Sequence, residues 1–166
     1  MTGPTILLLT EEALTAPDAQ RLIALHAGEP IHYRVLVPAD VERSLLVDVL
    51  DHLSMLELRQ ALEAARGDDD SPTRAQASQA LTQSVGALRS ALDGTEGATA
   101  DGTIIEGDPV AALQAAAGAD AATSEVVVVT RPHAVEDTFH RDWASRARSV
   151  LGLPVLHVYA GSSFLG

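Results

Sequence analysis

Two stretches near the C-terminus decide the fold: residues 125–130, which read EVVVVT, and residues 153–158, which read LPVLHV. Both are apolar at consecutive rather than alternating positions, a pattern typical of strands that are buried on both faces. A helical pattern at residues 135–151 separates them. The resulting strand–helix–strand unit predicts a parallel sheet that is covered by helices.

The rest of the chain continues this alternation of strands and helices. We expect strands at residues 5–10, 31–37 and 103–107, and helices at residues 16–27, 41–66, 73–92 and 109–117. Residues 67–72 (GDDDSP) and the Gly-rich residues 94–102 are expected to form loops. The prediction is an α/β fold with a five-stranded parallel sheet, helices on both faces, and one domain spanning residues 1–166.

The composition excludes several classes of function. The chain has neither cysteine nor lysine, which excludes disulfides, thiol nucleophiles, Schiff bases and a P-loop lysine. The formal net charge of −12 disfavours nucleic acid as a partner, and 3% aromatic residues provide no platform for base stacking. No apolar run is long enough to span a membrane, and no signal peptide is recognisable. We therefore expect a cytoplasmic protein without a nucleic-acid or membrane partner.

The end of the third predicted strand leads directly into a helix, in the sequence IEGDPVAAL at residues 105–113. Asp108 suits the N-cap and Pro109 the first helical position. This stretch resembles the strand–Gly-Asp-Pro–helix element of the universal stress protein family. The pair Ala119-Asp120 and the closing segments at residues 149–151 and 153–156 resemble the same family. The resemblance implies a five-stranded parallel sheet and a homodimer that pairs through the last strand.

Many universal stress proteins bind ATP through the signature Gly-x-x-Gly-x9-Gly-Ser/Thr after the fourth strand. Here that window reads Thr130-Arg131-Pro132-His133, followed by RDWAS at residues 141–145, so none of the three glycines is present. Proline has no amide hydrogen to offer a phosphate, and bulky neighbours obstruct the approach of the main chain. The family's early acidic residue has only Glu11 or Glu12 as a counterpart. We therefore expect the fold without this mode of ATP binding, and no cofactor.

Open α/β sheets bind ligands at the carboxyl ends of their strands. The residues that follow the predicted strands therefore form a candidate pocket for a small ligand: Thr10, Glu11, Asp40, Thr130, Arg131 and His133. Arg131 would suit an anionic ligand, because its guanidinium matches carboxylate and phosphate groups. The competing interpretation is an ordinary surface arginine.

Other polar clusters are interpreted as structural rather than as metal sites. His133, Glu136, Asp137 and His140 fall at helical spacing, but this spacing is no known zinc signature, so we interpret them as a solvated helix face. His157 lies in an apolar strand and is interpreted as a core or interface histidine. No Gly-x-Ser-x-Gly motif or other catalytic set is evident, so no catalytic residue and no metal ligand is assigned.

The sequence favours a non-enzymatic, stress-associated or regulatory domain that resembles a universal stress protein. The alternatives are a binding domain for a small anionic or adenine-containing ligand, and a metal-assisted enzyme built on His133 and His140. As partners we expect a second copy of the chain and an unidentified small molecule or protein. An apolar edge strand needs to be paired or covered. We therefore place the dimer interface at Leu153, Val155, Leu156, His157, Val158 and Tyr159.

Overall fold

The computed structural model describes residues 3–27, 29–39, 72–130 and 137–161, with the main chain only at residues 72–73 and 137–143. The helix expected at residues 41–66 and the acidic loop expected at residues 67–72 fall almost entirely outside the described residues, as does the segment at residues 131–136.

The five strands form one parallel sheet, as predicted. They are β1 (Thr5–Thr10), β2 (His32–Pro38), β3 (Thr99–Ile105), β4 (Thr123–Thr130) and β5 (Val155–Tyr159). Their order across the sheet is β3-β2-β1-β4-β5, and every neighbouring pair is parallel. The chain therefore builds outward from β1 to β3, returns to the other side of β1 as β4, and ends at β5.

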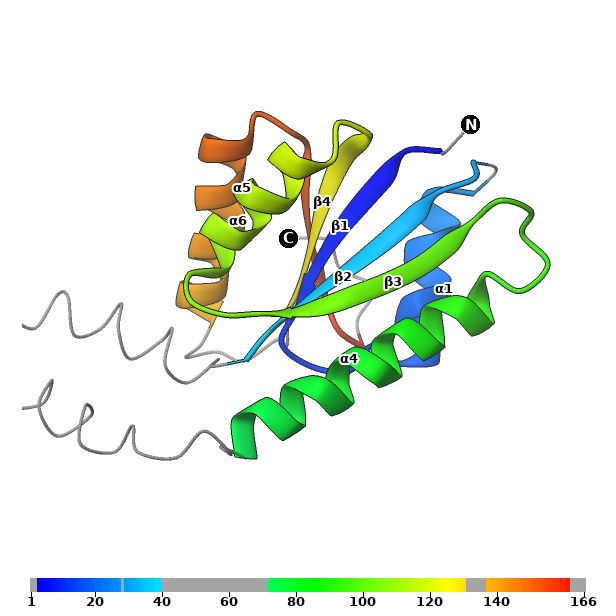
Figure 1. Cartoon of the computed structure of the whole chain (residues 1–166), viewed down its shortest axis with the longest axis horizontal. Coiled ribbons are helices and arrows are strands. Elements are labelled where there is room, and N and C mark those ends of the chain that lie inside the picture. Colours follow the sequence, from blue (N-terminus) through cyan, green and yellow to red (C-terminus); the bar gives the residue numbers. More distant parts are fainter. Residues whose placement is uncertain (1–2, 28, 40–71, 131–136, 162–166) are drawn as a thin grey trace, which may run out of the picture.

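Helices lie on both faces of the sheet (Figure 1). The helices α1 (Ala16–Leu25) and α4 (Pro72–Ala91) pack on one face, and α5 (Pro109–Ala119) and α6 (Asp137–Leu151) pack side by side on the other. The N-terminal signal predicted for α5 is present, and α1 begins with a capping box as well. Thr15 and Asp18 form a capping box at α1, and Asp108 accepts a hydrogen bond from Val110 N at the start of α5.

The two apolar clusters of the core lie on the two faces of the sheet and share its central strands. All six residues of β1 are buried, and so are the four valines of β4, from Val126 to Val129. Alternate residues of these strands point to opposite faces, so Leu8 and Val127 join the cluster under α1 and α4 while Leu9 and Val128 join the other. Burial of each such side chain stabilises the fold by about 1.5–3 kcal/mol. Consecutive apolar positions were therefore a correct indicator of strands covered on both sides.

The prediction for the third strand was wrong at its N-terminal end. β3 begins at Thr99, four residues before the predicted start, so Thr99 to Gly102 belong to the sheet and not to a loop. Ala100, Asp101 and Gly102 are of residue types depleted in strands, but tertiary packing overrides this preference. A Cβ added at Gly102 would lie 2.6 Å from Val35 O and 2.6 Å from Leu81 Cδ1, so this position needs a residue without a side chain.

Among the described helices, α5 and α6 contact β1, β4 and β5, and the same face of β2 and β3 carries a polar cluster. Asp101 on β3 lies 3.2 Å from Arg34 Nε and 3.2 Å from His32 Nε2, both on β2. His32 Nδ1 is also 2.7 Å from Thr99 Oγ1. On this face, β2 and β3 therefore carry polar side chains that pair with one another rather than an apolar surface.

Candidate functional site

The strand order reverses between β1 and β4, and this is the point where an open α/β sheet leaves a crevice for a ligand. The structure has a small hollow at the carboxyl ends of these two strands, which we call the strand-end hollow. Its volume is about 10 Å³, the room needed by about one water molecule. Its lining residues are Thr10, Glu11, Glu12, Ala13, Leu14, Val129, Thr130 and Ala160.

The loop between β1 and α1 fills the site from one side. Thr10 Oγ1 donates to Glu12 O at 2.8 Å, which turns the chain immediately after β1. Leu14 N then donates to Ser84 Oγ of α4 at 2.9 Å, and the side chains of Leu14 and Ser84 are both buried. The loop is thus anchored to α4, and the buried Leu14 is one of the residues that line the strand-end hollow.

The residues that follow β5 close the site from the other side. Ala160 N donates to Thr130 O at 2.8 Å, and Gly161 N donates to Asp18 Oδ1 at 2.9 Å. Asp18 is only 2% exposed, and its second oxygen, Oδ2, accepts from Thr15 Oγ1 at 2.6 Å. One buried carboxylate therefore joins the start of α1 to the chain leaving β5.

The environment of Asp18 stabilises the ionised carboxylate. Burial raises the pKa of Asp18, but the hydrogen bonds from Thr15 and Gly161, together with the charge of Arg21, outweigh burial and bring it below the ordinary value of 3.8. Arg21 Nη1 lies 3.6 Å from Asp18 Oδ1. The buried charge is therefore compensated by three hydrogen bonds and a nearby cation.

Among the described residues that line the strand-end hollow, Glu11 and Glu12 are acidic and none is basic.

The structure brings together three of the six predicted pocket residues. Thr10, Glu11 and Thr130 line the strand-end hollow. Asp40, Arg131 and His133 lie outside the described residues. Sequence reasoning missed Leu14, Asp18 as an anchor, and the contribution of Ala160 and Gly161. The capping role of Asp18 could have been read from its position three residues after Thr15, but its bond to Gly161 spans 143 residues and leaves no local signal.

His157 is a core histidine, one of the two interpretations that the sequence left open. Its side chain is 2% exposed, and its Nε2 lies 2.7 Å from Thr130 Oγ1. Its ring centroid is 4.6 Å from that of Tyr159. The side chains of His157 and Val158 are thus buried within this chain.

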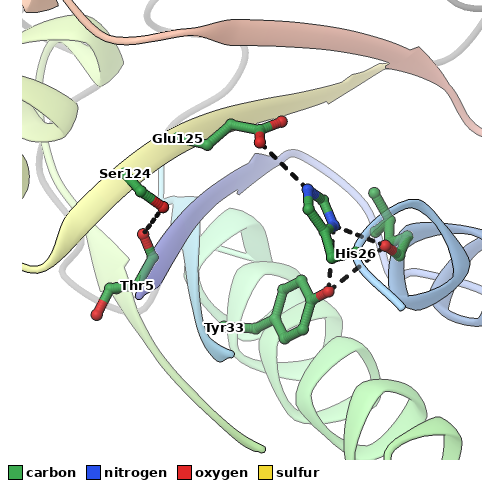
Figure 2. Close-up of polar contacts among 6 residues, drawn as sticks. Thr5, His26, Tyr33, Ser124 and Glu125 are labelled. Carbon is green, nitrogen blue, oxygen red and sulfur yellow. Dashed lines mark hydrogen bonds and ion pairs between the residues drawn. The ribbon is translucent and has the colours of Figure 1, made fainter. Parts of the chain in front are cut away.

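A second polar network lies near the amino ends of the strands, away from the strand-end hollow (Figure 2). His26, at the C-terminus of α1, places Nδ1 2.9 Å from Leu22 O and Nε2 3.2 Å from Glu125 Oε2 of β4. Tyr33 Oη lies 3.3 Å from His26 Nδ1, and burial, followed by the charge of Glu125, raises the pKa of Tyr33 to about 12. The network ties α1 to two strands and leaves Tyr33 as a neutral phenol.

Within the described part of the chain, no group of three His, Cys, Asp or Glu side chains is arranged to hold a metal ion. His133 and Glu136 lie outside the described residues, and the side chains of Asp137 and His140 are likewise not described. No described helix combines the length and the apolar character needed to cross a bilayer.

Comparison with known proteins gives a likeness in structure only. No protein-family model and no curated sequence matches the chain. Among solved structures, the universal stress protein from Archaeoglobus fulgidus in complex with dAMP matches with a TM-score of 0.53 and 14% identity, covering 96% of this chain and 99% of that chain. Another structure of a universal stress protein from the same organism matches with a TM-score of 0.50 and 13% identity, over 96% and 95% of the two chains.

A universal stress protein in complex with cAMP matches with a TM-score of 0.51 and 16% identity, over 97% of this chain and all of the other. At such low identity the shared feature is the architecture, and it extends over nearly the whole chain. The chain therefore has the fold of the universal stress proteins.

Proposed function

We propose that this chain is a divergent universal stress protein domain with a non-enzymatic, stress-associated or regulatory role, and that it does not bind ATP in the manner typical of the family. The observation that carries the proposal is the strand-end hollow. Pockets for small molecules measure about 300–1,000 Å³. At the position where a nucleotide would be expected, the described residues leave about 10 Å³.

The sequence after β4 supports the same proposal independently. A phosphate cradle needs main-chain N–H groups that a ligand can approach closely, and glycines provide that access. This chain has Arg131-Pro132-His133 in place of the glycines. The small volume of the hollow and the residues after β4 both argue against a bound triphosphate.

The test is a thermal-shift panel on the full chain with Mg-ATP, dAMP, cAMP, inorganic phosphate and divalent cations. A ligand at 1,000 times its Kd that binds only the native state would stabilise it by about 4.1 kcal/mol. We expect no shift with Mg-ATP, and a nucleotide-binding universal stress protein serves as the positive control. A clear shift with Mg-ATP would refute the proposal, whereas a shift with Zn²⁺ or Mn²⁺ alone would favour the metal-assisted enzyme built on His133 and His140.

The second candidate is a binding domain for a small anionic or adenine-containing ligand. It is favoured by the location of the hollow at the reversal point of the sheet, and by the solved structures of similar fold that are described as complexes with dAMP and cAMP. Such a ligand would bind by a different mode, in which the guanidinium of Arg131 contacts the anionic group of the ligand. A shift with dAMP or cAMP that is lost in Arg131→Ala would support this candidate.

We also propose that two copies of the chain pair through β5, in a cytoplasmic protein. β5 is an edge strand, and Val155, Leu156 and Tyr159 are only half-buried. Val126 N donates to Pro154 O, and Ala160 N donates to Thr130 O. The main-chain N–H and C=O groups of the even-numbered residues of β5 therefore point toward β4, and those of the odd-numbered residues point outward. Arg148 Nε already donates to Val155 O at 3.2 Å. A partner strand would therefore meet the main chain of His157 and Tyr159.

A further inference from the structure

The opposite edge of the sheet is formed by β3. Thr99 N donates to Ile31 O at 3.0 Å, and Ile105 O accepts from Ala39 N at 2.8 Å. The odd-numbered residues of β3 therefore pair with β2. In a parallel ladder the residues between them turn their N–H and C=O groups away from the neighbour. Ala100, Gly102 and Ile104 thus present an outward row of main-chain groups, which is a template for another strand.

An arginine of α4 donates a hydrogen bond to one of these outward carbonyl groups. Arg89, in the last turn of α4, donates from Nε to Ala100 O at 2.9 Å. α4 runs beside β3 (Figure 1), so the side chain reaches the edge directly from the helix below. Thr103 Oγ1 makes a weaker contact of 3.3 Å with Ile104 O. An arriving strand would have to displace the guanidinium before it could use Ala100 O as an acceptor.

The rest of β3 is consistent with an edge that is kept from pairing. Asp101 places a charge on the strand and pairs with Arg34 and His32 on the neighbouring β2. Charged side chains on edge strands discourage edge-to-edge association. Arg89 could also serve only as a positive charge near the C-terminus of α4, where it would complement the helix dipole. That role would affect stability but not association, so the two roles can be separated.

We propose that Arg89 closes the β3 edge to a second copy of this chain. The excluded contact is a two-fold pairing of β3 with the β3 of another molecule, because a symmetric dimer places the same edge against itself. The inference goes beyond the proposed function and does not depend on it. It applies whether or not the chain binds a ligand and whether or not β5 pairs.

The test compares the wild-type chain with Arg89→Met, Arg89→Lys and Arg146→Met. The first variant removes the donor but keeps an apolar stem of similar length, and the second keeps a donor and a positive charge. The third removes an arginine of α6 that pairs with Asp108 at 2.8 Å. Urea unfolding confirms that each variant is folded, and Arg89→Leu, which also lacks a donor, replaces Arg89→Met if that variant is not.

Two readouts decide the outcome: the mass from light scattering over a range of concentrations, and hydrogen exchange at the amides of Ala100, Gly102 and Ile104. We expect the mass of Arg89→Met to increase with concentration and hydrogen exchange at these three amides to slow several-fold. Arg89→Lys and Arg146→Met should match the wild type in both measurements. The proposal is overturned if Arg89→Met keeps the wild-type mass throughout, or if it associates while the newly protected amides lie elsewhere.

Discussion

At the scale of single residues, Asp18 links two parts of the molecule that are far apart in the sequence. Its carboxylate caps α1 through Thr15 and accepts the hydrogen bond from Gly161 N at 2.9 Å. Asp18→Asn keeps the size of the side chain but replaces one acceptor oxygen by an amide donor that faces Thr15. We expect the free energy of unfolding to fall by about 1–2 kcal/mol near neutral pH. Urea unfolding measures it, and an unchanged value would show that the bonds to Thr15 and Gly161 contribute little.

The same residue predicts a dependence on pH. Because the pKa of Asp18 in the folded chain lies below its ordinary value of 3.8, the ionised carboxylate stabilises the fold above that value. This contribution is lost as pH falls through the lower, folded-state pKa. The stability difference between the wild type and Asp18→Asn should therefore be full near neutral pH and shrink below 3.8. A difference that grew on acidification would contradict this assignment.

The sequence reveals residue roles only where partners are close along the chain. Asp108-Pro109 predicts the start of α5, and this is confirmed. The spacing of Thr15 and Asp18 is a local capping signal that the sequence also carries, although it was not used as a prediction. The bonds from Leu14 N to Ser84 and from Gly161 N to Asp18 connect residues 70 and 143 positions apart. Such bonds depend on how the layers pack, so no local pattern could have predicted that they would fill the site.

At the scale of secondary-structure elements, two glycines should respond in opposite ways to the same substitution. Gly102→Ala places a Cβ 2.6 Å from the main-chain oxygen of Val35, which cannot move without disturbing β2. We expect a loss of about 1–3 kcal/mol in the free energy of unfolding. Gly86 lies in α4 with nothing within 4 Å of an added Cβ. Gly86→Ala should therefore stabilise the chain by about 0.5–1 kcal/mol. Urea unfolding of both variants checks this, and a stable Gly102→Ala would mean that β3 and α4 are packed less closely.

The contrast between β4 and β3 explains which elements could be predicted. Four consecutive valines favour a short strand covered on both faces, and β4 is such a strand. β3 lies at an edge with polar side chains on one face, so its first residues carry neither an apolar run nor an alternation. The residue at which β3 begins depends on pairing with β2 and on packing against α4. Both exist only in the folded chain.

At the scale of the whole molecule, the proposed dimer can be tested through the outward N–H of Tyr159. Tyr159→Pro removes that donor, while Tyr159→Ala removes the ring but keeps the donor and serves as the control. We expect light scattering to give a dimer for the wild type and for Tyr159→Ala, and a monomer for Tyr159→Pro. Proline at the buried Val158 would be less informative, because it would disturb the core as well.

A wild-type mass near 17.3 kDa at micromolar concentration would contradict the dimer. A dimer that persists in Tyr159→Pro would instead place the interface away from β5.

The most direct test of the central claim, a universal stress protein fold without the family's mode of ATP binding, is a calorimetric titration of the full chain with Mg-ATP. The strand-end hollow has room for about one water molecule, and Glu11 and Glu12 lie in its lining. We predict no saturable heat up to millimolar nucleotide. A Kd near 1 μM, equivalent to about −8.2 kcal/mol of binding free energy, would contradict the account.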